Sequence, residues 1–410
     1  MKKTIFLNRA TPPHIITLVT IAGLSALTMN LFLPSMPSIA NYYQADYALV
    51  QLAISGYLAF TGLLQLVIGP LSDRYGRRPV TIVSLVVFLI ATALAPFAPT
   101  IETFLAIRML QAAVVSGMVL SRAIVRDIVS TDQAASMIGY VTMGMTLAPM
   151  VGPALGGIMD EMFGWQSSFA LLFVFGVATL ALSIADLGET NLNRSASMLK
   201  QFGAYPELIR SRRFWGYTLT ATFASGAFFS FLGAGPFVAT EILGMTPSEL
   251  GFYFVITAVG YMGGNFLSGR FAQQIGINRM MATGCMIAAL GMALSLMLFL
   301  AGLHHPLSFF GPIFFLGLGN GITLPSANAG IVSVRPHLAG SASGLGGAIT
   351  IGGGAVLSSM AGAVISVETG PYPLILIMLA SCVLSVFATL YVIRVERSLT
   401  ANTAIEQASS

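Results

Sequence analysis

The chain consists of long apolar segments separated by short gaps that carry almost all of the charged residues. Each segment approaches or exceeds the ~20 residues that an α-helix needs to cross ~30 Å of hydrocarbon. The twelve segments cover residues 15–38, 47–71, 80–98, 102–121, 134–158, 166–185, 214–240, 250–269, 280–303, 307–334, 338–366 and 371–393. The pattern predicts an all-α integral membrane protein with twelve transmembrane helices.

The basic residues predict the orientation of these helices. Of the nineteen Lys and Arg residues, eighteen fall in alternate gaps or at the chain ends, and the gaps in between contain none. Lysine and arginine accumulate in the short loops that stay on the cytoplasmic side of a membrane. Because twelve crossings return the chain to its starting side, both termini are predicted to be cytoplasmic.

Composition excludes several other classes of protein. A chain of 410 residues that is 56% hydrophobic and 8% charged does not form a soluble globule. Its formal charge of +4 is dispersed over loops, so no nucleic-acid partner is expected. Cys285 and Cys382 lie inside apolar segments, and the four histidines are scattered without ligand spacing. Neither a nucleophile elbow nor a Walker sequence is present, so we expect no enzyme, metal site or cofactor.

The chain also contains an internal repeat. A shift of 200 residues superimposes five pairs of glycines: Gly69 on Gly269, Gly76 on Gly276, Gly117 on Gly317, Gly144 on Gly344 and Gly152 on Gly352. Together with similarly placed apolar segments, these matches predict two pseudo-symmetric six-helix halves with a substrate site between them. The expected boundaries are an N-terminal half over 1–187, a cytoplasmic linker over 188–213, a C-terminal half over 214–396 and a cytoplasmic tail over 397–410.

The gap after the second segment contains a dense polar motif. It reads Gly69-Pro70-Leu71-Ser72-Asp73-Arg74-Tyr75-Gly76-Arg77-Arg78-Pro79. Its glycines permit a tight turn, and Asp73 is placed to pair with Arg77 and with a helix N-terminus. The motif resembles the cytoplasmic signature of the major facilitator superfamily, which implies a latch that holds one conformation of an alternating-access transporter. The second copy, with Gln273, Ile277 and Asn278 at the charged positions, is degenerate.

Two further motifs resemble one group within this superfamily. Arg108-Met109-Leu110-Gln111, followed by Arg122-Ala123-Ile124-Val125-Arg126-Asp127, is similar to the pattern of the Bcr/CflA drug exporters, named for bicyclomycin and chloramphenicol resistance. The fifth segment resembles the antiporter motif through Gly144, Pro149, Gly152, Pro153, Gly156 and Gly157. The resemblance implies a monomeric drug:proton antiporter of the bacterial inner membrane, driven by the proton gradient. It also implies that Asp127 joins the latch of Gly69, Asp73, Gly76, Arg77 and Arg78.

One cation, Arg108, lies well inside an apolar segment. It is roughly 10 Å below the outer surface at ~1.5 Å per helical residue, and a membrane-buried arginine costs at least ~2.5 kcal/mol unless it faces water or a partner. We therefore expect Arg108 to line a cavity. Asn30 lies at a similar depth in the first segment, within a stretch where related drug exporters commonly carry an aspartate.

Asn30 leaves the coupling mechanism open, because an asparagine does not exchange a proton at physiological pH. A boundary acid could carry the proton, with Asp160 as the candidate, although we expect Asp160 to be an exposed outer cap. The chain could instead be a facilitator, or an anion-selective transporter whose substrate supplies the counter-charge of Arg108. Asn30 could also be an engineered or degenerate change.

The expected cavity residues suggest the substrate class. They are Asn30, Phe32, Tyr57, Gln65, Arg108, Gln111, Phe228 and Phe229, with Phe231, Tyr253 and Tyr261 as further aromatic candidates. Such a lining suits amphipathic drug-sized molecules, and an embedded cation disfavours quaternary ammonium compounds. The expected function is export of phenicol- or bicyclomycin-like drugs across the bilayer in exchange for protons. A metabolite exporter or an uncoupled facilitator of the same superfamily is the alternative.

Overall fold

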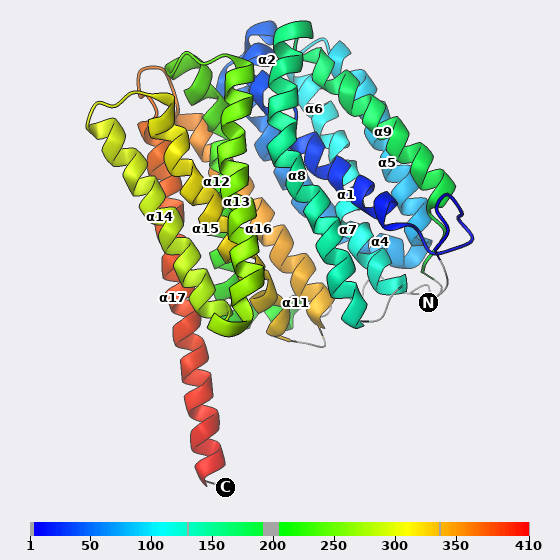
Figure 1. The fold of residues 1–410 in the computed structure, drawn as a ribbon, viewed down its shortest axis with the longest axis vertical. Helices are drawn as coiled ribbons and strands as arrows, with labels where there is room; N and C mark the ends of the chain where they lie inside the picture. Colours follow the sequence, from blue (N-terminus) through cyan, green and yellow to red (C-terminus); the bar gives the residue numbers. More distant parts are fainter. Residues whose placement is uncertain (1–3, 129–130, 192–204, 336–337, 410) are drawn as a thin grey trace. The chain divides into compact units, whose positions relative to one another are not determined.

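The computed structural model describes residues 4–128, 131–191, 205–335 and 338–409, and every regular element within these ranges is a helix (Figure 1). Eleven of the described helical segments are long and apolar enough to cross a membrane. One further helix of crossing length is α8 (Thr131–Phe163), which has 33 residues. The predicted all-α membrane fold of twelve helices is confirmed.

The described chain divides into two compact units, of which the first comprises residues 1–198 and 232–255. In this unit α1 packs against α7, α8 and α9, while α4 packs against α6 and α7. Its helices up to residue 186 are α1 (Ile15–Asn30), η1 (Leu33–Ser35), α2 (Met36–Tyr43), α3 (Tyr47–Val50), α4 (Leu52–Tyr75), α5 (Arg77–Leu94), η2 (Ala95–Phe97), α6 (Ile101–Gln111), η3 (Ala112–Val115), α7 (Ser116–Ile128), α8 (Thr131–Phe163) and α9 (Gln166–Asp186).

The second unit comprises residues 199–231 and 256–410. Within it, α14 packs against α15 and α17, and α16 packs against α11. The remaining helices of the chain are α11 (Tyr205–Ile209), α12 (Arg212–Phe237), the π-helix η4 (Val238–Ile242), α13 (Pro247–Ile275), α14 (Ile277–Leu300), α15 (Pro306–Ser333), α16 (Ala339–Val364) and α17 (Tyr372–Ser409). Residues 232–255, from α12 to α13, belong to the first unit.

Residues predicted as a C-terminal tail are helical. The apolar pattern ends near residue 393, yet α17 continues to Ser409 and extends well past the ends of α14 and α15 (Figure 1). The stretch after Arg394 contains no glycine or proline, so nothing in the sequence interrupts the helical backbone once it leaves the apolar span.

Two spans of the first unit change helical geometry beside the residues expected to line the cavity. The first is broken after Asn30, where Pro34 at the start of η1 removes a backbone donor. The fourth is α-helical up to Gln111 and continues as the 3₁₀ turn η3 before α7 begins. Short 3₁₀ stretches within a longer helix often mark hinges. Both breaks lie next to residues that the sequence predicts to line a cavity, Asn30 and Phe32 in the first span and Gln111 in the fourth.

The glycines of α8 provide close helix contacts. A Cβ atom on Gly156 would overlap the carbonyl oxygen of Leu31, and one on Gly152 would lie 3.3 Å from the Cβ of Asn30. A Cβ on Gly157 would overlap the carbonyl of Pro247, the first residue of α13. The absence of side chains therefore lets backbones approach directly. Gly144 and Pro149 belong to the part of α8 in which the surroundings of these residues are outside the described structure.

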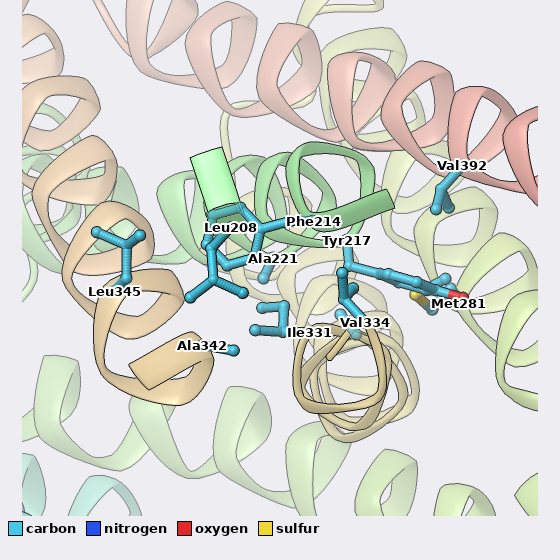
Figure 2. Packing of buried hydrophobic residues seen from close by; sticks show 11 residues of the cluster. Leu208, Phe214, Tyr217, Ala221, Met281, Ile331, Val334, Ala342, Leu345 and Val392 are labelled. Atoms are coloured by element: carbon cyan, nitrogen blue, oxygen red, sulfur yellow. The ribbon is translucent and has the colours of Figure 1, made fainter. Parts of the chain in front are cut away.

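An apolar cluster of buried side chains packs within the second unit (Figure 2). Tyr217 from α12 lies against Met281 of α14 and Val334, and Gly330 of α15 leaves the space that the Tyr217 ring occupies. Figure 2 also shows Leu345 on the side of α16 that faces the cluster. The many van der Waals contacts among these buried side chains stabilise the packing of the helices within the unit.

Replacement of Gly156 by alanine is expected to lower the free energy of unfolding by about 2 kcal/mol, because the added methyl forces α8 away from the Leu31 carbonyl. The matched control is Gly352→Ala on α16, where a Cβ meets nothing within 4 Å. Thermal unfolding of the purified proteins in detergent measures both. A Gly156→Ala protein as stable as the control would contradict the close contact.

Candidate functional site

Arg108 lies in the interior of the first unit and has no exposed surface. Its Nη1 donates to Oε1 of Gln111 at 2.6 Å, and Nε2 of Gln111 donates to Oγ1 of Thr92 at 2.8 Å. Gln111 follows Arg108 by three residues, so both side chains fall on one face of α6. The guanidinium therefore has a neutral amide as its hydrogen-bond partner, and this amide relays to a neutral hydroxyl on α5.

Two aromatic rings cover the guanidinium. The Cζ of Arg108 lies 4.1 Å from the ring centroid of Phe32 and 4.7 Å from that of Tyr57. Both distances are within the range of cation–π attraction, which strengthens when the cation is removed from water. The structure thus brings together four predicted cavity residues, Phe32, Tyr57, Arg108 and Gln111, from three separate spans.

Asn30, the last residue of α1, contacts the preceding turn of its own helix and α8. Its Nδ2 donates to the carbonyl of Ala26 at 2.7 Å, and its buried Oδ1 has no hydrogen-bond partner. Gly152 of α8 lies beside its Cβ. A buried amide oxygen without a donor is unfavourable by about 1–3 kcal/mol, so Asn30 is one of several residues that leave an unsatisfied polar atom in the interior of this unit.

The expectation that Asp160 is an exposed outer cap is wrong. Its residue is only 8% exposed, and its Oδ2 accepts a hydrogen bond from Oγ of Ser38 at 2.7 Å. Asp160 lies on the last turns of α8, where the chain passes close to α2, whereas the neighbouring Glu161 is exposed. The sequence placed both acids at a boundary and contained no sign that α2 would cover one of them.

The other predicted cavity residues are more dispersed. Gln65 is half-buried on α4. Phe228 and Phe229 belong to the second unit, where Phe228 lies 6.3 Å from Phe231 between ring centroids. Phe229 packs against Gly354 of α16. Their part in a shared cavity stays a prediction.

The side chains predicted to form a latch contact one another at the end of α4, and their role as a latch stays a prediction. Nη1 of Arg77 lies 2.6 Å from Oδ1 of Asp73, and its Nε donates to Oδ2 of Asp127 at 3.0 Å. Nη1 also donates to Oγ of Ser72. Gly76 adopts φ of +103° between α4 and α5, a conformation that side chains disfavour. The Arg77 latch, defined as Asp73, Arg77 and Asp127, therefore joins α4, α5 and α7.

Glu189 is a carboxylate beside the Arg77 latch that the sequence reasoning missed. Its carboxylate accepts hydrogen bonds from the backbone N–H of Arg77 at 2.9 Å and of Arg78 at 3.3 Å. It thus occupies the N-terminus of α5, where a negative charge is favoured by the helix dipole. Nε of Arg78 donates to the carbonyl of Leu187 nearby. The one signal in the sequence was the position of Glu189, an acidic residue just after the sixth apolar segment.

Asp186 is a second missed carboxylate. It is fully buried at the end of α9, and it accepts from the backbone N–H of Leu7 and His14 at 2.8 and 2.7 Å. Oγ1 of Thr17 donates to it at 2.6 Å. Asp186 therefore fastens the segment before α1 to the end of α9.

The second unit has a carboxylate cluster of its own. Glu396 on α17 accepts from Arg213 at 2.6 Å and from Oη of Tyr217 at 2.7 Å. Nδ2 of Asn278, at the start of α14, donates to the same carboxylate. Asn278 is the repeat counterpart of Arg78, so the degenerate motif still joins a helix start to the last span of its unit.

The fold and this distribution of polar groups define a polytopic membrane protein of the transporter class. The family model of the major facilitator superfamily matches residues 18–359. The chain is 28% identical over 386 residues to a bicyclomycin resistance protein homolog of Haemophilus influenzae, covering 93% of this chain and 96% of that protein. It is 32% identical over 324 residues to a chloramphenicol resistance protein of Pseudomonas aeruginosa, covering 77% and 76%.

A solved structure shares the same fold. The bacterial homolog to the human lysosomal transporter Spinster, in its inward-facing unoccupied conformation, superimposes with a TM-score of 0.69 at 17% identity, covering 93% of this chain and 96% of that chain. The chain belongs to the major facilitator superfamily. The resemblance to the bicyclomycin and chloramphenicol resistance group is confirmed by its relatives.

Replacement of Arg77 by glutamine is expected to lower the free energy of unfolding by about 2 kcal/mol, since it leaves two partly buried carboxylates without their cation. Arg78→Gln serves as the matched control, because that side chain gives up a hydrogen bond to one carbonyl. Chemical unfolding in detergent compares them. Equal stability of the two variants would remove the Arg77 latch as a structural element.

Proposed function

We propose that this protein is a drug-efflux transporter that exports amphipathic small molecules across the bacterial plasma membrane. The observation that carries the proposal is the Arg108 site, a charged group enclosed by aromatic rings inside a member of the major facilitator superfamily. Aromatic faces with few fixed polar groups suit drug-sized ligands of varied shape. The relatives named for bicyclomycin and chloramphenicol resistance support the same substrate class.

The transport cycle in this proposal is alternating access. The two halves rock about a central site, the Arg77 latch stabilises one of the two states, and the glycine face of α8 permits the sliding of helix against helix. The 3₁₀ turn η3, directly after Gln111, supports this mechanism because it supplies a deformable point beside the binding groups. Protons moving inward provide the energy, and no cofactor takes part.

Because residue 30 is an asparagine, the proton carrier in this proposal is a carboxylate at another position. Asp160 is the best placed, because it is buried and has a single hydroxyl partner recorded at its carboxylate. Burial favours the neutral form of a carboxyl group, which brings its protonation within reach of a pH gradient. An uncoupled facilitator or a metabolite exporter of the same superfamily is the alternative, favoured by the amide at Asn30.

Expression of the chain in a drug-sensitive bacterium is expected to raise resistance to chloramphenicol several-fold and to leave resistance to tetraphenylphosphonium unchanged. The physical reason is repulsion between a lipophilic cation and the buried guanidinium of Arg108. Minimum inhibitory concentrations, with expression levels matched by blotting, measure both. Equal resistance to the two compounds would contradict the proposed selectivity.

Replacement of Asp73 by asparagine is expected to slow drug transport roughly ten-fold, equivalent to about 1.4 kcal/mol, through loss of the charge-assisted pair with Arg77. Membrane insertion should be unaffected. Asp46→Asn, at an exposed loop position, is the control. Initial rates of uptake into inverted vesicles test this, and normal transport by Asp73→Asn would exclude the latch from the cycle.

Comparison of the chain with its Asn30→Asp variant tests proton coupling. In inverted vesicles with an imposed pH gradient, the unmodified chain is expected to move chloramphenicol and to dissipate the gradient, since Asp160 is available for the proton. Asp160→Asn is expected to abolish the gradient dependence. If gradient-driven transport occurs only after Asn30→Asp, position 30 is the missing proton site and the unmodified chain is a facilitator.

A further inference from the structure

One edge of the Arg108 guanidinium is unpaired. Nη1 donates to Gln111, whereas Nε and Nη2 are buried and have no hydrogen-bond partner. These two nitrogens present parallel N–H groups along the same edge of the planar guanidinium. This fork matches the two oxygens of a carboxylate, the geometry of the strongest arginine hydrogen bonds.

No protein carboxylate balances this cation within the described ranges. The ion pairs recorded there use Arg77, Arg213 and Arg335, and Arg108 takes part in none of them. Its polar chain runs through Gln111 to Thr92, both of which are neutral. Removing an unpaired charge from water is strongly unfavourable, so the site carries a net positive charge that an anion would relieve.

The surroundings restrict how such an anion can approach. The rings of Phe32 and Tyr57 lie against the guanidinium, and Nη1 is bonded to Gln111, so the buried Nε–Nη2 edge is the part of the group without a hydrogen-bond partner. The hydroxyl of Tyr57 is also buried without a hydrogen-bond partner. An amphipathic ligand with one carboxylate would satisfy the fork and place its apolar part among aromatic side chains.

Building on the proposed efflux function, we propose that Arg108 binds the carboxylate of the exported molecule side-on through Nε and Nη2, so that the preferred substrates are amphipathic monocarboxylates. The neutral side chain of Asn30 fits this assignment, because an amide, unlike a carboxylate, does not neutralise the positive charge of Arg108. Since the fork is closed to solvent in this structure, the ligand reaches it when the surrounding helices separate during the transport cycle.

The test uses two ligands of nearly equal size, chloramphenicol hemisuccinate and its methyl ester. Equilibrium dialysis against the purified full chain in detergent measures both dissociation constants at pH 7.5. The hemisuccinate is expected to bind about 10- to 100-fold more tightly than the ester, the range expected for hydrogen bonds to a charged group. Equal affinity of the two ligands would overturn the proposal.

Two variants test whether the preference for the hemisuccinate arises at Arg108. Arg108→Lys keeps the charge and loses the fork, and Gln111→Glu supplies a fixed carboxylate beside Nη1 with little change of shape. Each is expected to remove most of the preference for the hemisuccinate over the ester, measured as the ratio of the two dissociation constants within the same variant. Arg335→Gln, which removes an exposed arginine paired with Glu207, is the control and should retain the preference.

The outcomes separate this proposal from the proposed function. If the chain transports chloramphenicol but binds the hemisuccinate and the ester equally, the efflux function stands and the carboxylate site is wrong. If the hemisuccinate is preferred through Arg108 but no drug is transported, the site stands and the efflux function is wrong. If correctly folded Gln111→Glu and Arg108→Lys proteins still prefer the hemisuccinate, another group binds its carboxylate and the proposal is overturned.

Discussion

The lack of hydrogen-bond partners inside a lipid bilayer is the constraint on which the whole structure depends. Each unsatisfied polar group there is costly, so the backbone closes its hydrogen bonds within helices and charged side chains collect at helix ends. The Arg77 latch, Glu189 and Asp186 all follow this rule. Arg108 violates it, and for that reason it is the residue whose environment has to be explained by function.

Arg77 and Arg108 are accommodated in the protein in different ways. Arg77 has carboxylates from two other helices and a hydroxyl, so its charge is balanced within the protein and its role is to join helices. Arg108 has a neutral amide and two aromatic rings, which orient the guanidinium without neutralising it. A balanced site stabilises one arrangement of helices, whereas an unbalanced site retains affinity for a ligand. This difference is the physical ground for the proposal that Arg77 joins helices and Arg108 binds a ligand.

Predictions from sequence succeeded where a signal is local. The apolar runs predicted the membrane helices, and the spacing of Asp73 and Arg77 predicted a pair that forms at 2.6 Å. They failed where a contact joins distant positions. Glu189 lies more than a hundred residues from the Arg77 backbone it contacts, and Asp160 is covered by Ser38 of a different helix. No periodicity within one segment carries information about either contact.

The sequence by itself determined the class of this protein, because length and hydropathy of each segment decide whether it can cross a bilayer. It also singled out Arg108, since a charge within an apolar run is visible without coordinates. Only the tertiary structure decided which groups surround that charge. The Gln111 amide, the Phe32 and Tyr57 rings and the unpaired Nε and Nη2 edge come from three spans packed together. Hydrogen bonding and desolvation depend on distances of a few ångströms between segments, which the order of residues along the chain does not specify.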